Sequence, residues 1–498
     1  MNIGNFFFEI AKKRLDSPAI TFEEKTVSYK QLAILVEKWS DYLSSRITKD
    51  DRVLCVSENC PEIMAIYLAV AGLGGVFVPI NPQLTKEEIN DIFERSTPTV
   101  GIFSEKNKDI LPQIKVSISV NLFSVSEEKW VCKEFEEFEA DKGCLICFTS
   151  GSTGKAKGIY ISHQNEYTSC FQYSEYWDIQ KSDKVLVSLP QSFLYGLTTG
   201  CLMALFVGAQ IILEKKFHPI ETLNNIEKHQ VTVFMGVPTM YTMMLDVQSK
   251  ATKKYNTSSI QLMLTAGAPL ANEIFDEFKS LFSIEIVNFY ALSEIRPIFT
   301  YNLKQSDEIK RGSCGRKVKN VEVKLLAVDG KEIIKAGLEG EIVAKSDTLM
   351  LRYYDDLELT ENTIRDGWFY TGDLGMFDAN GYFYITGRKK ELVIRGGINI
   401  SPVEIEEILY KNPAILEAVI VGVPDEIFGE ELFGQIVLKE GNSLTDMELR
   451  EFLNEHLASY KVPKYIEFSN ELPKNNSGKI DKKKVKAGWG KSVLQQHN

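Results

Sequence analysis

The stretch from Phe148 to Gly158 holds a dense set of residues suited to binding phosphate. It reads Phe-Thr-Ser-Gly-Ser-Thr-Gly-Lys-Ala-Lys-Gly and contains three glycines, four hydroxyl side chains and two lysines. Glycines let a backbone turn tightly and bring its N–H groups close to a ligand, while hydroxyls add donors and lysines add positive charge. Together these groups can form a cradle for a polyphosphate. The same residue types are common in solvated turns, so the loop alone leaves both interpretations open.

Two familiar nucleotide-binding motifs do not fit this stretch. The Walker motif has a glycine where this chain has Thr149, and a serine or threonine after its lysine, whereas Ala156 follows Lys155 here. Apolar runs on both sides predict that the loop joins two strands and does not open a helix. The chain also lacks a G-x-G-x-x-G fingerprint. The sequence therefore argues against a plain P-loop nucleotide hydrolase and against a Rossmann oxidoreductase.

Composition limits the class of protein. A chain of 498 residues is too long for one core and predicts two or more domains. Its content of 44% hydrophobic and 25% charged residues is that of an ordinary globular protein. A net charge of -11 argues against a general nucleic-acid binder. No stretch approaches the roughly 18 apolar residues that a membrane span requires.

Cysteine and histidine usage indicates neither a metal site nor a disulfide framework. Cys144 and Cys147 form a C-x-x-C inside an apolar run, which predicts buried strand thiols. The five histidines show no ligand spacing. The N-terminus reads as the first helix of the fold and not as a signal peptide, so we expect a cytoplasmic protein.

Alternating strand and helix patterns divide the chain into a large and a small domain. Before about residue 300 they predict two helix-covered, largely parallel sheets. From about Gly312, alternating strands and the Asp329–Gly330 turn predict an antiparallel, barrel-like region. We expect an α/β protein: residues 1–389 with two helix-flanked sheets plus a small β-barrel-like subdomain, then a small α+β domain, residues 390–498. Its last residues, Lys482–Asn498, are expected to be frayed.

The individual elements follow from the same patterns. The expected strands are Val53–Val56, Val76–Ile80, Val185–Leu189, Ala209–Leu213, Thr232–Met235, Leu262–Ala266, Glu285–Phe289, Ala418–Val423 and Gln435–Leu438. The expected helices are Glu62–Ala71, one starting at Thr85 with a capping signal, Pro402–Tyr410 and Thr445–Leu457.

Five further motifs follow the loop along the chain. They are Asn288-Phe-Tyr-Ala-Leu-Ser-Glu294, Tyr370-Thr-Gly-Asp373, Gly387-Arg-Lys-Lys390, Arg395-Gly-Gly-Ile-Asn-Ile-Ser-Pro-Val-Glu-Ile-Glu406 and Leu472-Pro-Lys-Asn-Asn-Ser-Gly-Lys-Ile480. With the loop, they resemble in kind and order the motifs of the adenylate-forming superfamily. That superfamily includes acyl-CoA synthetases, the adenylation domains of nonribosomal peptide synthesis and luciferases. The resemblance covers nearly the whole chain.

The resemblance implies an enzyme that activates a carboxylic acid in two steps. The acid is first joined to the α-phosphate of ATP, which releases pyrophosphate, and a thiol then displaces AMP. Negative charge builds on the α-phosphate in the first step, so fixed cations and donors are needed around it. The implied cofactors are ATP, Mg²⁺ and coenzyme A, or the phosphopantetheine arm of a carrier protein.

The resemblance also assigns the nucleotide to particular residues. The β- and γ-phosphates are expected at Thr149, Ser150, Gly151, Ser152, Thr153, Gly154 and Lys157. Tyr290 would stack on adenine, with Gly267, Ala268 and Pro269 along the other edge of the base. Asp373, helped by Arg388, would accept the ribose hydroxyls. Outside the motif context, Tyr290 is as typical of a core aromatic residue, and Asp373 of a turn.

Catalysis is expected to depend on Lys479, Glu294 and Ser293. Lys479 would bridge the carboxylate and the α-phosphate, although only motif context distinguishes it from neighbouring lysines. Ser293 stands where a threonine usually contacts the α-phosphate, and Glu294 would help to hold Mg²⁺. The C-terminal domain would be mobile, swinging about a hinge at Lys390 after adenylation, so that Gly396 and Gly397 line a thiol channel.

A further set of residues resembles the substrate pocket of the family: Phe193, Leu194, Gly196, Ala291 and Leu292. Leu194 falls where amino-acid-activating relatives carry an aspartate, so the ammonium of an α-amino acid would be buried without a partner. This predicts an apolar acid, short or medium acyl or aromatic. Ala291 adds a methyl group to the pocket wall and mildly disfavours a long, straight chain. Arg296, just past Glu294, could face a second polar group of the substrate or lie at the surface, and of the two we expect a surface arginine.

The resulting hypothesis is a ligase that makes an acyl- or aryl-CoA. The close alternative loads the acyl group onto the phosphopantetheine arm of a separate carrier protein, and the sequence barely separates the two. A non-catalytic nucleotide-binding relative is a third possibility. The joint presence of Lys157, Glu294, Asp373 and Lys479 argues against it.

Overall fold

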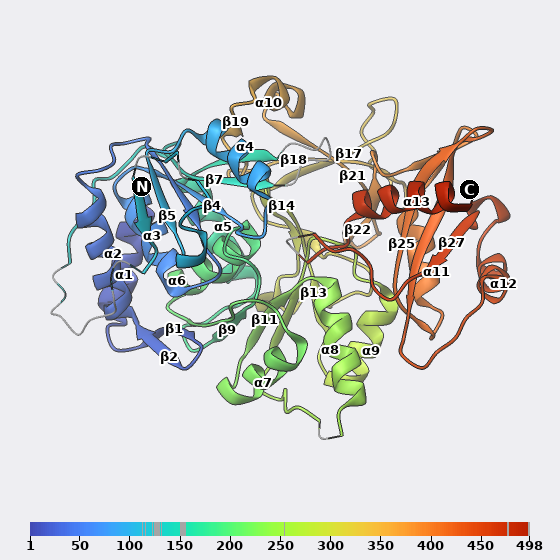
Figure 1. Cartoon of the computed structure of the whole chain (residues 1–498), viewed down its shortest axis with the longest axis horizontal. Coiled ribbons are helices and arrows are strands. Elements are labelled where there is room, and N and C mark those ends of the chain that lie inside the picture. Colours follow the sequence, from blue (N-terminus) through green and yellow to red (C-terminus); the bar gives the residue numbers. More distant parts are fainter. Residues whose placement is uncertain are drawn as a thin grey trace.

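Two seven-stranded sheets form most of the chain up to Tyr354 (Figure 1). The computed structural model describes residues 1–111, 113–114, 116–121, 123, 130, 132–149, 156–252, 254–475 and 478–496. The first sheet has the order β19 (Arg352–Tyr354), β8 (Lys157–Ser162), β7 (Gly143–Thr149), β4 (Val76–Ile80), β3 (Arg52–Val56), β5 (Val100–Phe103) and β6 (Ser117–Ser119). The second has the order β13 (Ile286–Asn288), β12 (Leu262–Thr265), β11 (Val233–Gly236), β9 (Lys184–Val187), β10 (Gln210–Leu213), β1 (Pro18–Phe22) and β2 (Lys25–Ser28).

Both sheets have a parallel centre, as the sequence predicts. The neighbours β3, β4 and β5 run parallel, and so do β9, β10, β11 and β12. The pair β7 and β8 is antiparallel, with Thr149 opposite Lys157, so the glycine-rich segment does join two strands. The expected strands in both sheets are confirmed to within a few residues.

Helix α3 (Pro61–Gly72) lies in the core of the large domain. Every residue except Glu62 is buried, because the segment is apolar on all sides. Helices α1 (Ile3–Lys13) and α2 (Tyr29–Leu43) pack against it. Other helices cover the sheets: α4 (Lys86–Ser96), α5 (His163–Tyr176), α6 (Met203–Val207), α7 (Pro219–His229), α8 (Pro238–Lys250) and α9 (Asn272–Phe282). The capping box expected at Thr85 is present at the start of α4.

Antiparallel strands follow the two sheets. They are β14 (Tyr290–Leu292), β15 (Ile295–Thr300), β16 (Arg316–Lys317), β17 (Glu322–Leu326), β18 (Gly340–Lys345), β20 (Ile364–Arg365), β21 (Trp368–Phe377) and β22 (Phe383–Arg388), with α10 (Leu357–Thr363) before β20. The turn expected at Asp329–Gly330 forms, with Gly330 at a φ of 81° and its N–H donated to Ala327 O. The expected antiparallel region is confirmed.

The chain from Val393 forms a separate lobe with its own sheet and hydrophobic clusters (Figure 1). Its elements are β23 (Val393–Arg395), β24 (Ile398–Ile400), α11 (Pro402–Tyr410), β25 (Ile415–Asp425), β26 (Gly429–Leu438), α12 (Asp446–His456), β27 (Tyr465–Phe468) and α13 (Lys482–Gln496). The predicted fraying from Lys482 is wrong at its start: Lys482 begins α13 and pairs with Glu391 at 2.8 Å, and Val485 is buried. The division of the chain at Lys390 stays a prediction.

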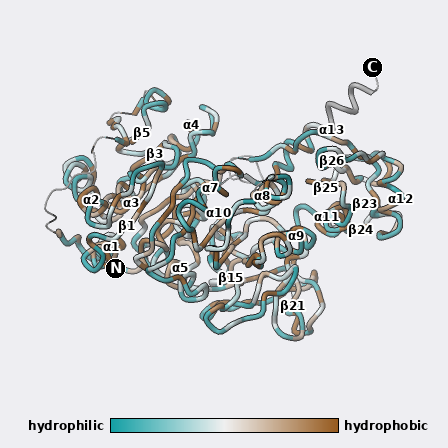
Figure 2. Tube along the Cα trace, turned by 90° about the horizontal axis from the view of Figure 1, so that it is seen from below, coloured by the Kyte–Doolittle hydropathy of each residue, from teal (hydrophilic) through white to brown (hydrophobic). Residues whose placement is uncertain are grey.

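Apolar stretches run through the interior of the molecule and polar ones along outer helices such as α4 (Figure 2). Cys144 and Cys147 are buried in β7, and burial raises the pKa of Cys147 to about 12, as expected for an unreactive thiol. In the part of the chain that the structure describes, no helix combines the length and apolar character needed to cross a membrane.

Candidate active site

One end of the glycine-rich loop, Lys157, lies near Tyr353, which contacts Glu294. Ser150, Gly151, Ser152, Thr153 and Gly154 lie outside the described residues, whereas Thr149 and Lys157 are the facing ends of β7 and β8. Lys157 Nζ is 5.1 Å from the centre of the Tyr353 ring, and the Tyr353 hydroxyl donates to Glu294 Oε1 at 2.8 Å. Strand β19 carries Tyr353 to this position because it pairs with β8. Tyr353 therefore lies between a cation and a carboxylate that come from distant segments of the chain.

Glu294 is suited to a magnesium ion that a nucleotide brings with it. Burial and the Glu294 carboxylate raise the pKa of Tyr353, so its hydroxyl remains a donor to that carboxylate. Among the described residues, no three His, Cys, Asp or Glu side chains gather as a ready-made metal site. Mg²⁺ is commonly held by one or two carboxylates together with substrate phosphates. A single carboxylate near a phosphate loop fits that pattern.

Tyr290, Asp373 and Arg388 form a second group. The Tyr290 hydroxyl donates to Asp373 Oδ2 at 2.6 Å, and Arg388 Nε lies 2.6 Å from Oδ1. Asp373 faces Arg388 across the β21–β22 pair. Burial raises the pKa of Asp373, while Arg388 and Tyr290 oppose the shift. The Tyr290 ring also stacks on Phe299, with centroids 5.5 Å apart, so Tyr290 belongs to the core and to the site at once.

Lys479 reaches this group from the C-terminal lobe. A Cβ atom built on Gly267 would lie 2.6 Å from Lys479 Cε and 2.7 Å from Nζ, so the lysine occupies the space that a side chain at position 267 would need. Gly267, with a φ of 88°, lies in the loop after β12, and Ala268 and Pro269 follow it. Desolvation and the nearby Arg388 lower the pKa of Lys479 to about 8, against the opposing effect of Asp373. The predicted catalytic lysine and the predicted ribose-binding residues thus share one neighbourhood.

The predicted acyl pocket residues lie on two adjoining segments. Phe193, Leu194 and Gly196 lie at the start of the π-helix η2 (Tyr195–Leu202), where a Cβ on Gly196 would come 2.4 Å from Pro190 O. Ala291 and Leu292 are half-buried in β14, and Ser293 and Glu294 follow them directly. Tyr195 connects the two segments, because its ring packs edge-on against Phe289 at 5.5 Å. π-Helical turns are often found at functional sites.

Arg296 is not at the surface, contrary to the prediction. Its side chain is 3% exposed and forms an ion pair with the fully buried Glu166 of α5. Strand β15 packs on α5, which carries the guanidinium into the core. Arg296 also donates to the Ser293 carbonyl at 3.3 Å, immediately beside the predicted catalytic residues. Burial raises the pKa of Glu166 and Arg296 opposes the shift.

The predicted hinge and thiol-channel residues lie in two turns, one on each side of β23. Lys390 is exposed in the turn between β22 and β23. Gly396 and Gly397, with φ of 56° and 84°, form the turn between β23 and β24. Among the described residues, no atom lies within 4 Å of a Cβ built on Gly397, and the Gly396 position meets only Phe428 of the same lobe. This turn faces open space in the present arrangement.

Three residues of the site escaped the sequence analysis: Tyr195, Thr239 and Tyr353. Tyr195 donates its hydroxyl toward the carbonyls of Gly236 and Leu264, which lie at the ends of β11 and β12. Thr239 donates to the Gly478 carbonyl at 2.8 Å. Tyr195 lies between two predicted pocket residues, Leu194 and Gly196, which was a usable signal, whereas no predicted motif adjoins Tyr353. Nothing in its own segment marks Thr239.

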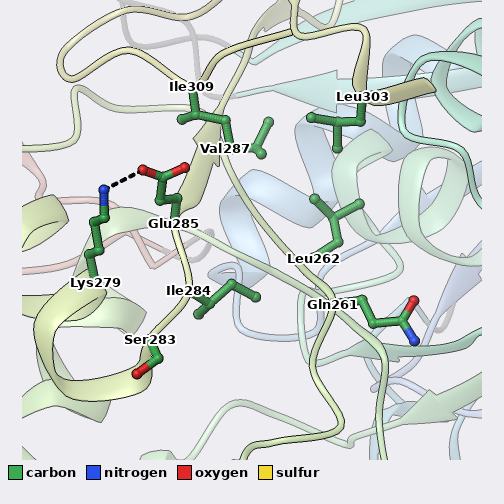
Figure 3. Close-up of a pocket in the computed structure, with 9 residues that line it drawn as sticks. All are labelled: Gln261, Leu262, Lys279, Ser283, Ile284, Glu285, Val287, Leu303 and Ile309. Carbon is green, nitrogen blue, oxygen red and sulfur yellow. Dashed lines mark hydrogen bonds and ion pairs between the residues drawn. The ribbon is translucent and has the colours of Figure 1, made fainter. Parts of the chain in front are cut away.

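A surface hollow of about 500 Å³ lies at the end of the second sheet where β12 and β13 begin (Figure 3). Gln261 and Leu262 at the start of β12 line it, and the ion pair between Lys279 and Glu285, at 2.7 Å, borders it. The described residues that line it include none of the predicted site residues. Ligands of open α/β sheets bind beyond the carboxyl ends of the strands, where Gly267 and Tyr290 lie.

Comparison with known proteins agrees with this geometry. Residues 7–354 match the family model described as AMP-binding enzyme, and residues 404–479 match the AMP-binding enzyme C-terminal domain. The chain is 31% identical to a long-chain-fatty-acid–CoA ligase of Bacillus subtilis, covering 94% of this chain and 91% of that protein. It is also 31% identical to an indoleacetate–CoA ligase of Aromatoleum aromaticum, covering 94% of each.

The solved structure of ATP-bound MatB from Rhodopseudomonas palustris is similar over its whole length. It superposes with a TM-score of 0.89 at 28% identity, covering 98% of this chain and 99% of that one. The apo structure of the same protein gives a TM-score of 0.78 at the same identity. Both structures are of the same protein and have the same sequence identity to this chain, so the difference between the two TM-scores reflects a difference in conformation. The arrangement of the present chain is the more similar to that of the ATP-bound protein.

Proposed function

The chain belongs to the family of AMP-binding enzymes and is an acid–thiol ligase, and we propose that it joins an apolar carboxylic acid to coenzyme A by way of an acyl-adenylate. ATP supplies the AMP group, and pyrophosphate leaves. The observation that carries this proposal is the position of Lys479 against Gly267, beside Asp373 and Arg388. A cation brought there from another lobe suits a reaction centre on which negative charge develops.

In the first step, a carboxylate oxygen of the acid forms a bond to the α-phosphorus and the bond to pyrophosphate breaks. Lys479 is proposed to lie between the carboxylate and the α-phosphate, where it offsets the charge of both. The loop residues, with Lys157, would hold the β- and γ-phosphates, and Ser293 would contact the α-phosphate. Glu294 would hold Mg²⁺, which offsets phosphate charge when bound. The pair of acceptor oxygens on Asp373 suits the two ribose hydroxyls.

In the second step, the thiol sulfur of coenzyme A bonds to the acyl carbon, AMP leaves, and the thiol proton is released. The small domain is proposed to turn about Lys390, which withdraws Lys479 and brings the Gly396–Gly397 turn to the site. Side chains at these glycines would obstruct a narrow thiol arm.

The acid is proposed to be apolar, short or medium acyl or aromatic. Leu194 is 4% exposed and offers no charge to an α-ammonium group, which would be costly to bury unpaired. Arg296, which donates to the Ser293 carbonyl, is already paired with Glu166 and is left out of substrate binding. The names of the relatives, a long-chain-fatty-acid–CoA ligase and an indoleacetate–CoA ligase, support the apolar character of the acid and not its length.

ATP–pyrophosphate exchange over a panel of carboxylic acids tests this function. We expect exchange with one group of apolar acids and none with α-amino acids. Lys479→Ala should lose exchange by about a hundredfold or more, since removing one charge-stabilising group at a reaction centre commonly has this effect. The variant should keep thioester formation from a supplied acyl-adenylate. Absence of exchange with every acid, or equal loss of both half-reactions in the variant, would contradict the proposal.

The same assay identifies the acceptor. With an active acid, coenzyme A and a phosphopantetheinylated carrier protein are offered separately as thiols. We expect acyl-CoA as the product. Transfer to the carrier protein alone would establish the alternative acceptor.

A further inference from the structure

The segment that carries Lys479 is a small hairpin with internal hydrogen bonds. Asn475 N–H donates to Lys479 O at 2.7 Å, and Lys479 N–H donates to Asn475 Oδ1 at 3.1 Å. Lys474 pairs with Ile480 in a β-bridge, and Asp481 N–H donates to Pro473 O at 2.7 Å. Because these bonds lie within the C-terminal lobe, they shape the hairpin whichever way the lobe is turned. They do not determine where the hairpin rests.

The part of the hairpin tip that the structure describes, Gly478, rests on the start of helix α8. Gly478 precedes Lys479, and its carbonyl accepts a hydrogen bond from the Thr239 hydroxyl at 2.8 Å. A Cβ built on Gly478 would lie 3.6 Å from Val237 Cγ2 and 3.8 Å from Met240 Cε, so the backbone of the tip packs closely on this helix end. In Figure 1 the C-terminal lobe sends a red loop back toward the region of α8 and β13.

Other contacts between the large domain and the C-terminal lobe lie farther from Lys479 along the chain. Asn272 Nδ2 donates to Glu407 Oε2 at 2.9 Å. Lys250 lies 2.9 Å from Glu440, and Lys439 lies 3.3 Å from Glu277. These contacts orient the lobe, whereas the Thr239 bond acts on the residue next to the lysine.

We propose that Thr239 is a positioning residue for the first half-reaction. By holding the Gly478 carbonyl, its hydroxyl places Lys479 against Gly267, and the bond is broken when the lobe turns for thiol transfer. This inference rests on the proposed function. The residue is proposed to act through Lys479 and not by contact with ATP or the acid.

The test is a comparison of the two half-reactions in Thr239→Val, which keeps the shape of the side chain and removes its donor. Loss of one neutral hydrogen bond predicts a decrease of about 3- to 10-fold in pyrophosphate exchange. Transfer from a supplied acyl-adenylate should be unchanged or faster. Thr239→Ser, which keeps the hydroxyl, should restore exchange. Thr242→Val is the matched control, because Thr242 lies one turn along α8 and bonds only to Pro238 O, at 3.2 Å, among the contacts described.

A second measurement needs no substrate. Zero-length carbodiimide coupling joins Lys250 to Glu440 only when the lobe is docked, whereas coupling to Asp246, 3.0 Å away on the same helix, is independent of docking. We expect the ratio of the two products, measured by mass spectrometry, to be at least about twofold lower in Thr239→Val than in Thr242→Val.

The outcomes separate this inference from the proposed function. The positioning role is overturned if the wild type is active and Thr239→Val exchanges pyrophosphate at the same rate. It is also overturned if both half-reactions decrease equally in the variant. Failure of the wild type to activate any acid rejects the function instead, and the cross-linking ratio then decides whether Thr239 docks the hairpin. An unchanged ratio overturns the docking role in either case.

Discussion

Lys479 carries its amine into a region where burial and Arg388 both disfavour a second positive charge. Asp373 offsets part of this effect, and the phosphates of ATP would offset more. The nucleotide would therefore stabilise the charged form of the amine. A side chain at position 267 would displace the end of the lysine, and the φ of 88° there favours glycine on its own account.

A pH dependence of the first half-reaction follows. The pKa of Lys479, lowered to about 8, means that the amine is mostly charged at pH 7 and becomes neutral as the pH rises through that value. We expect kcat/KM for ATP in the exchange reaction, which reports the free enzyme, to fall about tenfold per pH unit above about pH 8. Lys479→Arg should lower the rate and remove this fall, because arginine stays charged. A flat wild-type profile to about pH 9.5 would show that another group governs the step.

At the scale of elements, helix α5 packs on strand β15 through a buried ion pair. Arg296 and Glu166 join the two elements inside the core, directly behind Ser293 and Glu294. Burying two charges costs free energy of desolvation, and removing one partner leaves the other charge buried without compensation. Because Arg296 also donates to the Ser293 carbonyl, the ion pair fixes the backbone of the turn between β14 and β15.

Arg296→Met should therefore destabilise the large domain. Leaving Glu166 charged or protonated without its partner is expected to cost about 3–5 kcal/mol, measured as a lower midpoint of urea unfolding. The double variant Glu166→Leu/Arg296→Met should regain most of the loss, because both buried charges are then removed. Lys279→Met, which breaks the exposed pair with Glu285, is the control and should leave the midpoint nearly unchanged. Equal midpoints for Arg296→Met and the control would rule out a structural role for the pair.

Elements with local signals could be predicted from the sequence, and long-range contacts could not. The start of α4 follows from its capping box and the interior position of α3 from its uniform apolarity. The burial of Arg296 depends on Glu166, a partner 130 positions away, and arginine next to a loop motif is more typical of a surface. Thr239 was missed because its bond is made to a backbone carbonyl 239 positions away, which no side-chain pattern reveals. The motifs identified Lys479, but only the packed lobes place it at Gly267.

At the scale of the whole molecule, the large domain and the C-terminal lobe meet through both apolar and polar contacts. Two of these are ion pairs between exposed side chains, Lys250 with Glu440 and Lys439 with Glu277. Exposed pairs contribute little individually and are screened by salt. An interface of this kind holds the lobe in place without preventing it from turning.

Ionic strength should consequently shift the balance between the half-reactions. Between about 0.05 M and 0.5 M sodium chloride, at saturating substrates, we expect pyrophosphate exchange to fall about two- to threefold while transfer from acyl-adenylate stays constant, because screening weakens both ion pairs. Lys250→Met/Lys439→Met should show the lower exchange rate already at low salt and little further change. A parallel decrease of both half-reactions in the wild type would indicate a general salt effect on the enzyme.

The Lys479 hairpin and the Gly396–Gly397 turn are parts of one compact lobe. While Lys479 lies against Gly267, the glycine turn faces open space. A single body cannot present both to the same site, so the two proposed steps exclude one another in time. The enzyme would then need no separate signal to keep a thiol away from unreacted ATP. The order of the steps follows because the Lys479 hairpin must leave the site before the Gly396–Gly397 turn can reach it.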